Sequence, residues 1–392
     1  MLLAATIVNV ICVSDVAWNF LWQRQHHLLT RLPKDWKILY VEPSFWKSLA
    51  LRMINFYSKI KTPTNNRNYI IVKSIPTIPL LDRSRTLRKI NDSLIIHIMH
   101  FFVQRYDLQD AILIIYNPRF SCVLGKLDES LSCYEIIDEK MEFEALPRWL
   151  EINHKLLVRN ASLITVSSSI LHKTINLERK NDVFLIGNGA DVSHFRKATL
   201  DIQIPYDVLS IKNPILGYIG AIGEWFDFEL LEYILKSRPN VAVVMIGWVF
   251  NKQRSIINRL AKTYANLHFL GRRSYDHLPN YIKAFSACIL PFRIYKLTEA
   301  INPTKLYEYM AAGKPVISTA LPEAAVYNRV IYIANNYAEF LEFIDKALAD
   351  PKYNTVELLE IASKHDWQNK IREMLDIIEL KLKTTSKSTT TD

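Results

Sequence analysis

The stretch Asn302-Pro303-Thr304-Lys305-Leu306-Tyr307-Glu308-Tyr309-Met310-Ala311-Ala312-Gly313-Lys314-Pro315-Val316 predicts a short helix that can hold an anion at its front end. Asn302 is a favoured N-cap residue and Pro303 fits the first helical position, so the N–H groups of Thr304 and Lys305 face outwards. Such a helix start attracts phosphate. Lys305 adds a positive charge, and Glu308, one turn on, offers an acceptor for sugar hydroxyls on the same side.

The rest of this stretch predicts a helix end followed by a strand. Leu306, Tyr309 and Met310 form the opposite, core-facing stripe. Gly313 provides a left-handed cap, after which residues 316–318 are typical of a strand. We therefore expect a helix, a cap and a strand in succession.

Working outwards, short apolar runs alternate with amphipathic segments of helix length along the whole chain of 392 residues. This alternation is typical of α/β units with parallel sheets. Length favours two doubly wound, Rossmann-like domains, at 1–200 and 201–383, with a loose tail at 384–392 and a hinge at 196–213. Ligands are expected in a cleft between the domains, beyond the carboxyl ends of the strands. The predicted strands are 4–13, 36–42, 69–74, 111–116, 132–137, 162–166, 183–186, 214–219, 241–246, 267–270, 286–291, 315–318 and 330–333.

Glycine is scarce, with 9 residues in the chain, and three of them follow the first strand of the second domain. In that loop Gly220 and Gly223 would let phosphate oxygens approach the backbone, and Asp227 begins the next helix. Any tight turn from a strand to a helix could use these glycines equally well. Arg272 and Arg273, after a later strand, are either ligands for a diphosphate or plain surface.

In the first domain, the run 132–137 ends at Asp138, whose carboxylate could be the general base for an acceptor hydroxyl. The alternative for Asp138 is a helix N-cap. His26 and His27, in the first helix, are rival bases, although each histidine could equally be an ordinary packed residue.

The net charge is +10, and most of the excess falls in residues 1–200. Nucleic acid and the anionic inner face of a membrane are both candidate partners. No zinc-ligand spacing or RNA-binding aromatic motif accompanies the charge, which favours the membrane. Residues 46–60 show the pattern of a basic amphipathic interfacial helix, and a helix packed on its own sheet would show the same stripe.

The chain contains no Asp-x-Asp and no cluster with metal-ligand spacing, so we expect no metal and no required cofactor. The 4 cysteines show no paired spacing, which favours a reduced, cytoplasmic protein. The apolar start is interpreted as a buried strand and not a signal peptide. No run approaches the ~20 apolar residues of a membrane span.

Taken together, these motifs resemble those of the bacterial group 1 glycosyltransferases with the GT-B fold, the type found in teichuronic acid, capsule and lipopolysaccharide assembly. The resemblance rests on Trp22-Gln23-Arg24, Gly187-Asn188-Gly189-Ala190-Asp191 with Phe195, the glycine loop, Phe269-Leu270-Gly271-Arg272-Arg273, Leu290-Pro291-Phe292 and the opening stretch.

The resemblance implies a nucleoside-diphosphate sugar bound by the second domain, through Thr304, Lys305, Leu306 and Glu308, and a glycan or lipid-linked acceptor bound by the first. Lys305 would contact the diphosphate and Glu308 the ribose. The family's further glutamate falls on Ala300 here, which leaves the stereochemistry open, with a lean towards inversion. The alternatives are a non-catalytic scaffold of a polysaccharide assembly complex and a sugar-nucleotide epimerase.

Overall fold

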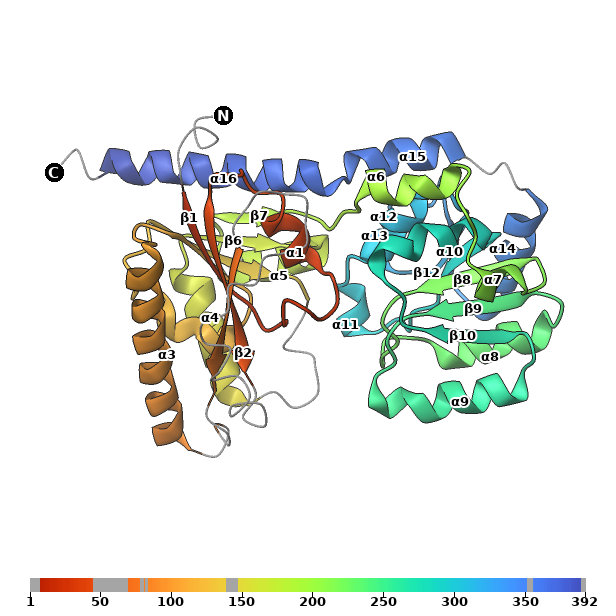
Figure 1. The fold of residues 1–392 in the computed structure, drawn as a ribbon, viewed down its shortest axis with the longest axis horizontal. Helices are drawn as coiled ribbons and strands as arrows, with labels where there is room; N and C mark the ends of the chain where they lie inside the picture. Colours follow the sequence, from red (N-terminus) through yellow and green to blue (C-terminus); the bar gives the residue numbers. More distant parts are fainter. Residues whose placement is uncertain are drawn as a thin grey trace. The chain divides into compact units, whose positions relative to one another are not determined.

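The computed structural model describes residues 8–44, 70–77, 81, 84–138, 147–350 and 355–388. The chain divides into two compact units (Figure 1). Unit 1 combines Met1–Ile186 with Lys370–Asp392, and unit 2 is Gly187–Asn369. Each unit is an α/β domain built on its own parallel sheet.

The sheet of unit 1 has the strand order β3-β2-β1-β4-β5-β6-β7, and every described pairing is parallel. Its strands are β1 (Asn9–Val13), β2 (Lys37–Ser44), β3 (Ile70–Pro76), β4 (Ile112–Ile115), β5 (Leu131–Ile136), β6 (Leu163–Val166) and β7 (Val183–Leu185). Its helices are α1 (Arg24–Leu29), α3 (Arg85–Tyr106), η5 (Pro118–Val123), α4 (Arg148–Asn160), α5 (Ser169–Glu178) and α16 (Trp367–Ser388).

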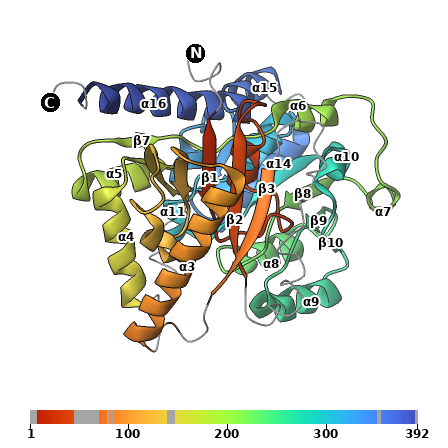
Figure 2. The ribbon, with the colours of Figure 1, turned by 60° about the vertical axis from the view of Figure 1, so that its left-hand side comes forward.

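The core of unit 1 lies between this sheet and the helices on its two faces. β1, β4 and β5 are almost continuously buried, as expected of parallel strands covered on both sides. α3 and α4 lie side by side and both pack against η5 (Figure 2). On α16, Ile371, Met374 and Ile378 are buried and line a small space together with Leu28 and Trp36. The last helix of the chain therefore completes the first domain.

Unit 2 has a sheet in the order β10-β9-β8-β11-β12-β13, also parallel throughout. Its strands are β8 (Ile215–Ile219), β9 (Ala242–Ile246), β10 (Leu267–Gly271), β11 (Ala287–Leu290), β12 (Val316–Thr319) and β13 (Tyr332–Ala334). Its helices are α6 (Val192–Phe195), η7 (Arg196–Thr199), α7 (Tyr206–Leu209), α8 (Phe228–Ser237), η8 (Asn251–Gln253), α9 (Arg254–Thr263), η9 (Tyr275–His277), α10 (Leu278–Ala284), α11 (Lys296–Glu299), α12 (Thr304–Ala311), α13 (Pro322–Ala325), α14 (Tyr337–Ala349) and α15 (Thr355–Lys364).

Each sheet has one point where the strand order reverses. In unit 1 it lies between β1 and β4, and in unit 2 between β8 and β11. At such a switch point the two following connections leave in opposite directions, which opens a crevice beyond the carboxyl ends of the strands. The two switch points are therefore the places where each domain is best suited to bind a ligand.

The domain boundaries differ from those expected from the sequence. The chain passes between units at Ile186–Gly187 and again at Asn369–Lys370, not at 196–213. Phe195 is fully buried in the core of unit 2, which fixes the segment after Gly187 in that unit. Of the expected tail at 384–392, residues 384–388 continue helix α16, and the rest lies outside the described residues. The predicted amphipathic segment at 46–60 lies outside the described residues.

All 13 predicted strands correspond to strands of the two sheets, within a few residues at their ends. In the part of the chain that is described, no helix combines the length and the apolar character needed to cross a lipid bilayer.

The four cysteines are free thiols, and burial raises the pKa of the Cys288 thiol to about 12.

Candidate functional site

Helix α12 starts at the switch point of unit 2, after β11 and the short α11. As predicted, Leu306, Tyr309 and Met310 are fully buried, and Gly313 has a left-handed φ of 64°. The first helical residue is Thr304, and no side chain caps the helix. Among the described residues, no protein acceptor binds the N–H groups of Thr304 and Lys305. The helix start thus offers two uncommitted donors.

The predicted N-cap role of Asn302 is corrected by the structure. The cap position is Pro303, and the Asn302 amide donates instead to Glu323 Oε2 at 2.9 Å. The backbone carbonyl of Asn302 accepts from Asn188 Nδ2 at 2.7 Å. The Gly187-Asn188-Gly189 turn therefore fixes the segment that leads into α12, a function that its glycines alone did not reveal.

Lys305 and Glu308 lie on the same side of α12, as their spacing predicted. Lys305 Nζ is 2.8 Å from Glu308 Oε2, and their side chains are 24% and 5% exposed. The ion pair places an ammonium group beside the helix start. The carboxylate is nearly buried, and its second oxygen remains for another donor.

Leu306, which lies between Lys305 and Glu308 in the sequence, has a different environment. The Leu306 side chain is fully buried, and its N–H donates to Pro303 O at 3.1 Å. Leu306 therefore supports the segment from the core side.

The glycine loop lies at the same switch point, immediately after β8. The Gly220 N–H donates to Ile246 O at 2.9 Å, which continues the pairing of β8 with β9. In the described part of the chain, the N–H groups of Ala221 and Gly223 have no protein acceptor. A Cβ on Gly220 would lie 2.9 Å from Tyr218 Oη, so a side chain is excluded there. The loop thus offers the N–H groups of Ala221 and Gly223 as backbone donors.

The loop and α12 are joined by a contact that sequence reasoning missed. Tyr309 Oη accepts from Ile219 N at 2.7 Å, at the last residue of β8. Tyr309 is completely buried and its pattern indicated only a core position. The available signal was a tyrosine in a core stripe, where phenylalanine would fill the same space. A buried hydroxyl requires a hydrogen-bond partner, so Tyr309 could have been expected to bond another segment.

Asp227 and Arg273, two of the predicted ligands, are engaged by protein groups. Asp227 caps α8 by accepting from Leu230 N at 2.9 Å, and it also accepts from Tyr337 Oη. Arg273 Nη2 is 2.8 Å from Asp207 Oδ2. These contacts connect separate segments of unit 2 and stabilise the domain.

Arg272 is placed differently from its neighbour. It is exposed at the carboxyl end of β10, directly after Gly271, whose φ is 70°. Arg272 is thus the more exposed of the two arginines, because the Arg273 side chain is 32% exposed and paired with Asp207.

The three candidate bases of unit 1 lie in two environments. Asp138 is half-buried and follows the carboxyl end of β5. His26 is fully buried, with its Nδ1 3.1 Å from Gln23 N and its Nε2 3.1 Å from Trp18 O. Burial lowers the pKa of His26 to about 4.

The second histidine of the pair is also enclosed. His27 is 3% exposed, and its Nδ1 accepts from Trp22 Nε1 at 3.2 Å. Both histidines are packed residues of α1, and only Asp138 has substantial access to solvent.

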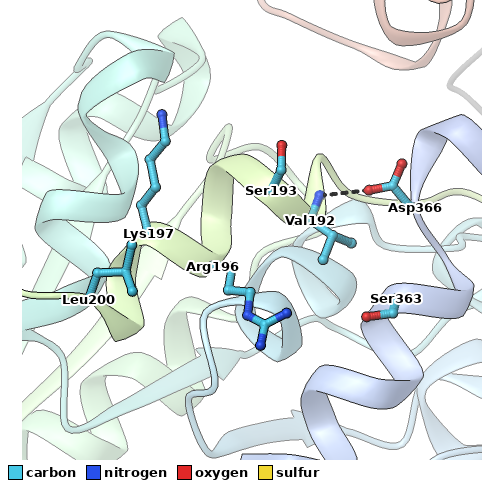
Figure 3. Close-up of a pocket in the computed structure, with 7 residues that line it drawn as sticks. All are labelled: Val192, Ser193, Arg196, Lys197, Leu200, Ser363 and Asp366. Atoms are coloured by element: carbon cyan, nitrogen blue, oxygen red, sulfur yellow. Dashed lines mark hydrogen bonds between the residues drawn. The ribbon is translucent and has the colours of Figure 1, made fainter.

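Away from the switch point, unit 2 has a shallow hollow of about 500 Å³ between α6–η7 and α15 (Figure 3). Figure 3 shows the Asp366 carboxylate accepting from the Val192 N–H, at 3.1 Å. The hollow contains none of the ligand residues predicted from the sequence. Within the described residues, no group of three or more His, Cys, Asp or Glu side chains is arranged to hold a metal ion.

The chain is similar to several known proteins. The family model for glycosyl transferases group 1 matches residues 213–350, which include the glycine loop, Arg272 and α12. The chain is 24% identical over 230 residues to a protein named as a teichuronic acid biosynthesis glycosyltransferase of Bacillus subtilis (strain 168). That match spans 56% of this chain and 57% of the relative.

Solved structures resemble the chain over nearly its whole length. The Anabaena protein HepE, crystallised with UDP and glucose, superposes with a TM-score of 0.69 at 15% identity, over 94% of this chain and 99% of that one. Sucrose-phosphate synthase from Thermosynechococcus elongatus gives 0.68 at 16% identity, over 95% and 98%. At these identities the likeness establishes a shared fold.

Proposed function

We propose that the chain is a group 1 glycosyltransferase of the GT-B fold, and that it transfers a sugar from a nucleoside-diphosphate donor to a hydroxyl group of a glycan acceptor in cell-surface polysaccharide synthesis. The observation that supports this most strongly is the meeting of two sets of uncommitted backbone donors at one switch point, beside Lys305 and Glu308.

The donor diphosphate is placed, in this proposal, between the glycine loop and the start of α12. The N–H groups of Ala221, Gly223, Thr304 and Lys305 would donate to its oxygens, and the helix dipole would add a partial positive charge. The free oxygen of Glu308 suits a ribose hydroxyl. The structure of HepE contains UDP, which makes a uridine nucleotide the first donor to test.

The proposed reaction displaces the nucleoside diphosphate from the anomeric carbon. The acceptor oxygen forms a bond to that carbon, the bond from the carbon to the diphosphate oxygen breaks, and the acceptor proton passes to a base. Asp138 is favoured as the base, because His26 and His27 are enclosed. Lys305 and the helix start would stabilise the charge of the leaving group, a role that does not require a metal ion. Unchanged turnover after dialysis against a chelator would support that last point.

The test is turnover of Lys305→Ala, measured as nucleotide released from a panel of donors with membrane-extracted acceptors. We expect the variant to lose donor turnover and to keep the wild-type circular dichroism spectrum. Lys262→Ala, which removes an exposed lysine of α9, is the matched control. Normal turnover by Lys305→Ala would contradict the proposal.

A scaffold without catalysis is favoured by one observation, the buried Ala300 where the family has a glutamate. A scaffold need not bind UDP, GDP or dTDP, so titration of the three nucleotides separates it from a transferase. An epimerase would change the donor without any acceptor, which analysis of the sugar after incubation with donor alone would reveal.

Peripheral contact with the inner face of the membrane and a lipid-linked acceptor are also proposed. The support is the basic excess of residues 1–200 together with the apolar side chains that α3 exposes, Ile90, Leu94 and Phe101, at 52%, 37% and 47%. Sedimentation with vesicles that contain anionic lipid should retain the wild-type protein and lose Phe101→Ser. Equal binding by both would count against α3 as the contact.

A further inference from the structure

A pocket of about 760 Å³ lies at the switch point of unit 1, far along the chain from the donor residues. β1 and β4 are neighbours, with Val13 opposite Ile115, so the residues two positions further on, Asp15 and Asn117, meet at the edge of the sheet. Asn117 Nδ2 donates to Asp15 Oδ2 at 3.1 Å, and both residues line the pocket. Its volume falls within the ~300–1,000 Å³ of ordinary ligand sites.

The lining of this pocket is strongly basic. The carboxylates on it are Asp15 and Asp92, and the cations number five: Arg85, Arg88, Lys89, Arg119 and Arg148. Among the described residues, none of these five cations makes an ion pair. We call these five residues the basic pocket cluster.

Two guanidinium groups of the cluster contact the same indole ring. The Cζ atoms of Arg88 and Arg119 are 5.8 Å and 5.3 Å from the centre of the Trp149 ring. Arg88 also donates to Leu81 O at 2.9 Å. Guanidinium groups positioned by such contacts in one pocket suit the several oxygens of a phosphate or diphosphate.

The positions of the cations are unfavourable for stability. Arg85 and Arg148 are the first residues of α3 and α4, where the helix dipole disfavours positive charge. Arg85 also repels Arg88 and Lys89, because residues three and four apart are neighbours on a helix. A bound anion would offset the unfavourable charges at these two helix starts.

The geometry points to a binding site for a phosphate or diphosphate ester, which in the reaction proposed above belongs to the acceptor. The two long helices α3 and α4 have their first residues, Arg85 and Arg148, in the lining of the pocket, so their positive ends add to the field of the cluster. Trp149 and the 59% exposed Ile152 provide an apolar surface for the group attached to the phosphate. The acceptor role rests on the proposed function, whereas the binding of a phosphate ester does not.

The experiment is calorimetric titration of the full chain with inorganic pyrophosphate, with geranyl diphosphate and with a glycerol phosphate oligomer. Geranyl diphosphate stands for a lipid-linked acceptor, and the oligomer for a phosphodiester glycan. We expect Arg119→Gln to weaken binding of the preferred ligand about tenfold or more, in keeping with one lost charge-assisted contact. Arg159→Gln, an exposed arginine at the far end of α4, is the matched control and should bind as the wild type does.

A double variant, Arg85→Gln with Arg148→Gln, tests the proposal if Arg119→Gln folds poorly. Arg85 and Arg148 are exposed at the rim of the pocket, so their replacement should not disturb folding. This double variant should bind the phosphate ester more weakly and melt at the wild-type temperature or above it, because it removes unfavourable charges. Binding within twofold of the wild type by both variants would overturn the proposal.

The Lys305→Ala variant distinguishes ligand binding at the donor site from ligand binding in this pocket. Lys305→Ala should lose UDP binding and keep phosphate-ester binding. Arg119→Gln should weaken phosphate-ester binding and keep UDP binding. A wild-type protein that binds the phosphate ester and no nucleotide would refute the proposed function and leave the pocket standing.

Discussion

The two switch points of this chain share a topology and differ in how they present positive charge. In unit 2 the donors are backbone N–H groups of a glycine loop and a helix start, and the nearby cation, Lys305, is paired with Glu308. In unit 1 the crevice is lined by the five side chains of the basic pocket cluster, which have no ion-pair partners in the described structure. A parallel sheet thus fixes where a ligand can bind and leaves open whether backbone or side chains bind it.

This difference predicts which substitutions affect folding and which affect binding. A site made of backbone depends on glycines and on the helix register, so changes there disturb the domain. A site made of unpaired side chains can lose a charge without loss of stability.

The largest effect is expected for Arg24→Met, because this arginine of unit 1 is paired and buried. Arg24 Nε lies 2.7 Å from Glu135 Oε1, with the two side chains 2% and 0% exposed. Loss of one partner of a buried pair costs about 3–5 kcal/mol, because the other charge stays without compensation. Urea unfolding should show this loss, whereas Arg119→Gln should unfold near the wild-type midpoint. Equal midpoints for all three proteins would contradict the contrast.

The second prediction concerns Gly247→Ala, beside the glycine loop. Gly247 has a φ of 152°, and a Cβ there would lie 1.8 Å from Gly220 O, a backbone atom. Strained backbone and overpacking each cost about 1–3 kcal/mol, so unit 2 should lose about 3 kcal/mol and its nucleotide affinity. Phosphate binding by unit 1 should persist. Gly125→Ala, where a Cβ meets no atom within 4 Å although φ is 68°, is the milder comparison.

The third prediction is a pH dependence. Burial lowers the pKa of His26 from 6.5 to about 4, so the folded state binds fewer protons than the unfolded state between these values. The contribution of His26 to the free energy of unfolding is therefore fully present above pH 6.5. It decreases as the pH drops towards 4, by at most about 1.4 kcal/mol per pH unit. Urea unfolding at several pH values should show this slope in the wild type. A slope of the same size in His26→Gln would assign it to other groups.

The sequence was sufficient to predict the strands and the helix that follows Pro303, because the 13 apolar runs and the Pro303 to Gly313 pattern are local signals. The boundary at Ile186–Gly187 and the return of α16 to unit 1 depend on packing between distant segments. The same holds for the engagement of Arg273 by Asp207, 66 residues away. The basic pocket cluster escaped prediction because its members come from three separate helices, although the charge excess of residues 1–200 was visible.

The most direct test of the central claim is calorimetric titration of UDP into the wild-type protein, Lys305→Ala and the control Lys262→Ala. If the start of α12 and Lys305 hold the donor diphosphate, the wild type and Lys262→Ala should bind UDP with equal affinity, and Lys305→Ala should bind it at least about tenfold more weakly, the loss of one charge-assisted contact. Equal UDP affinity in all three proteins would contradict the account.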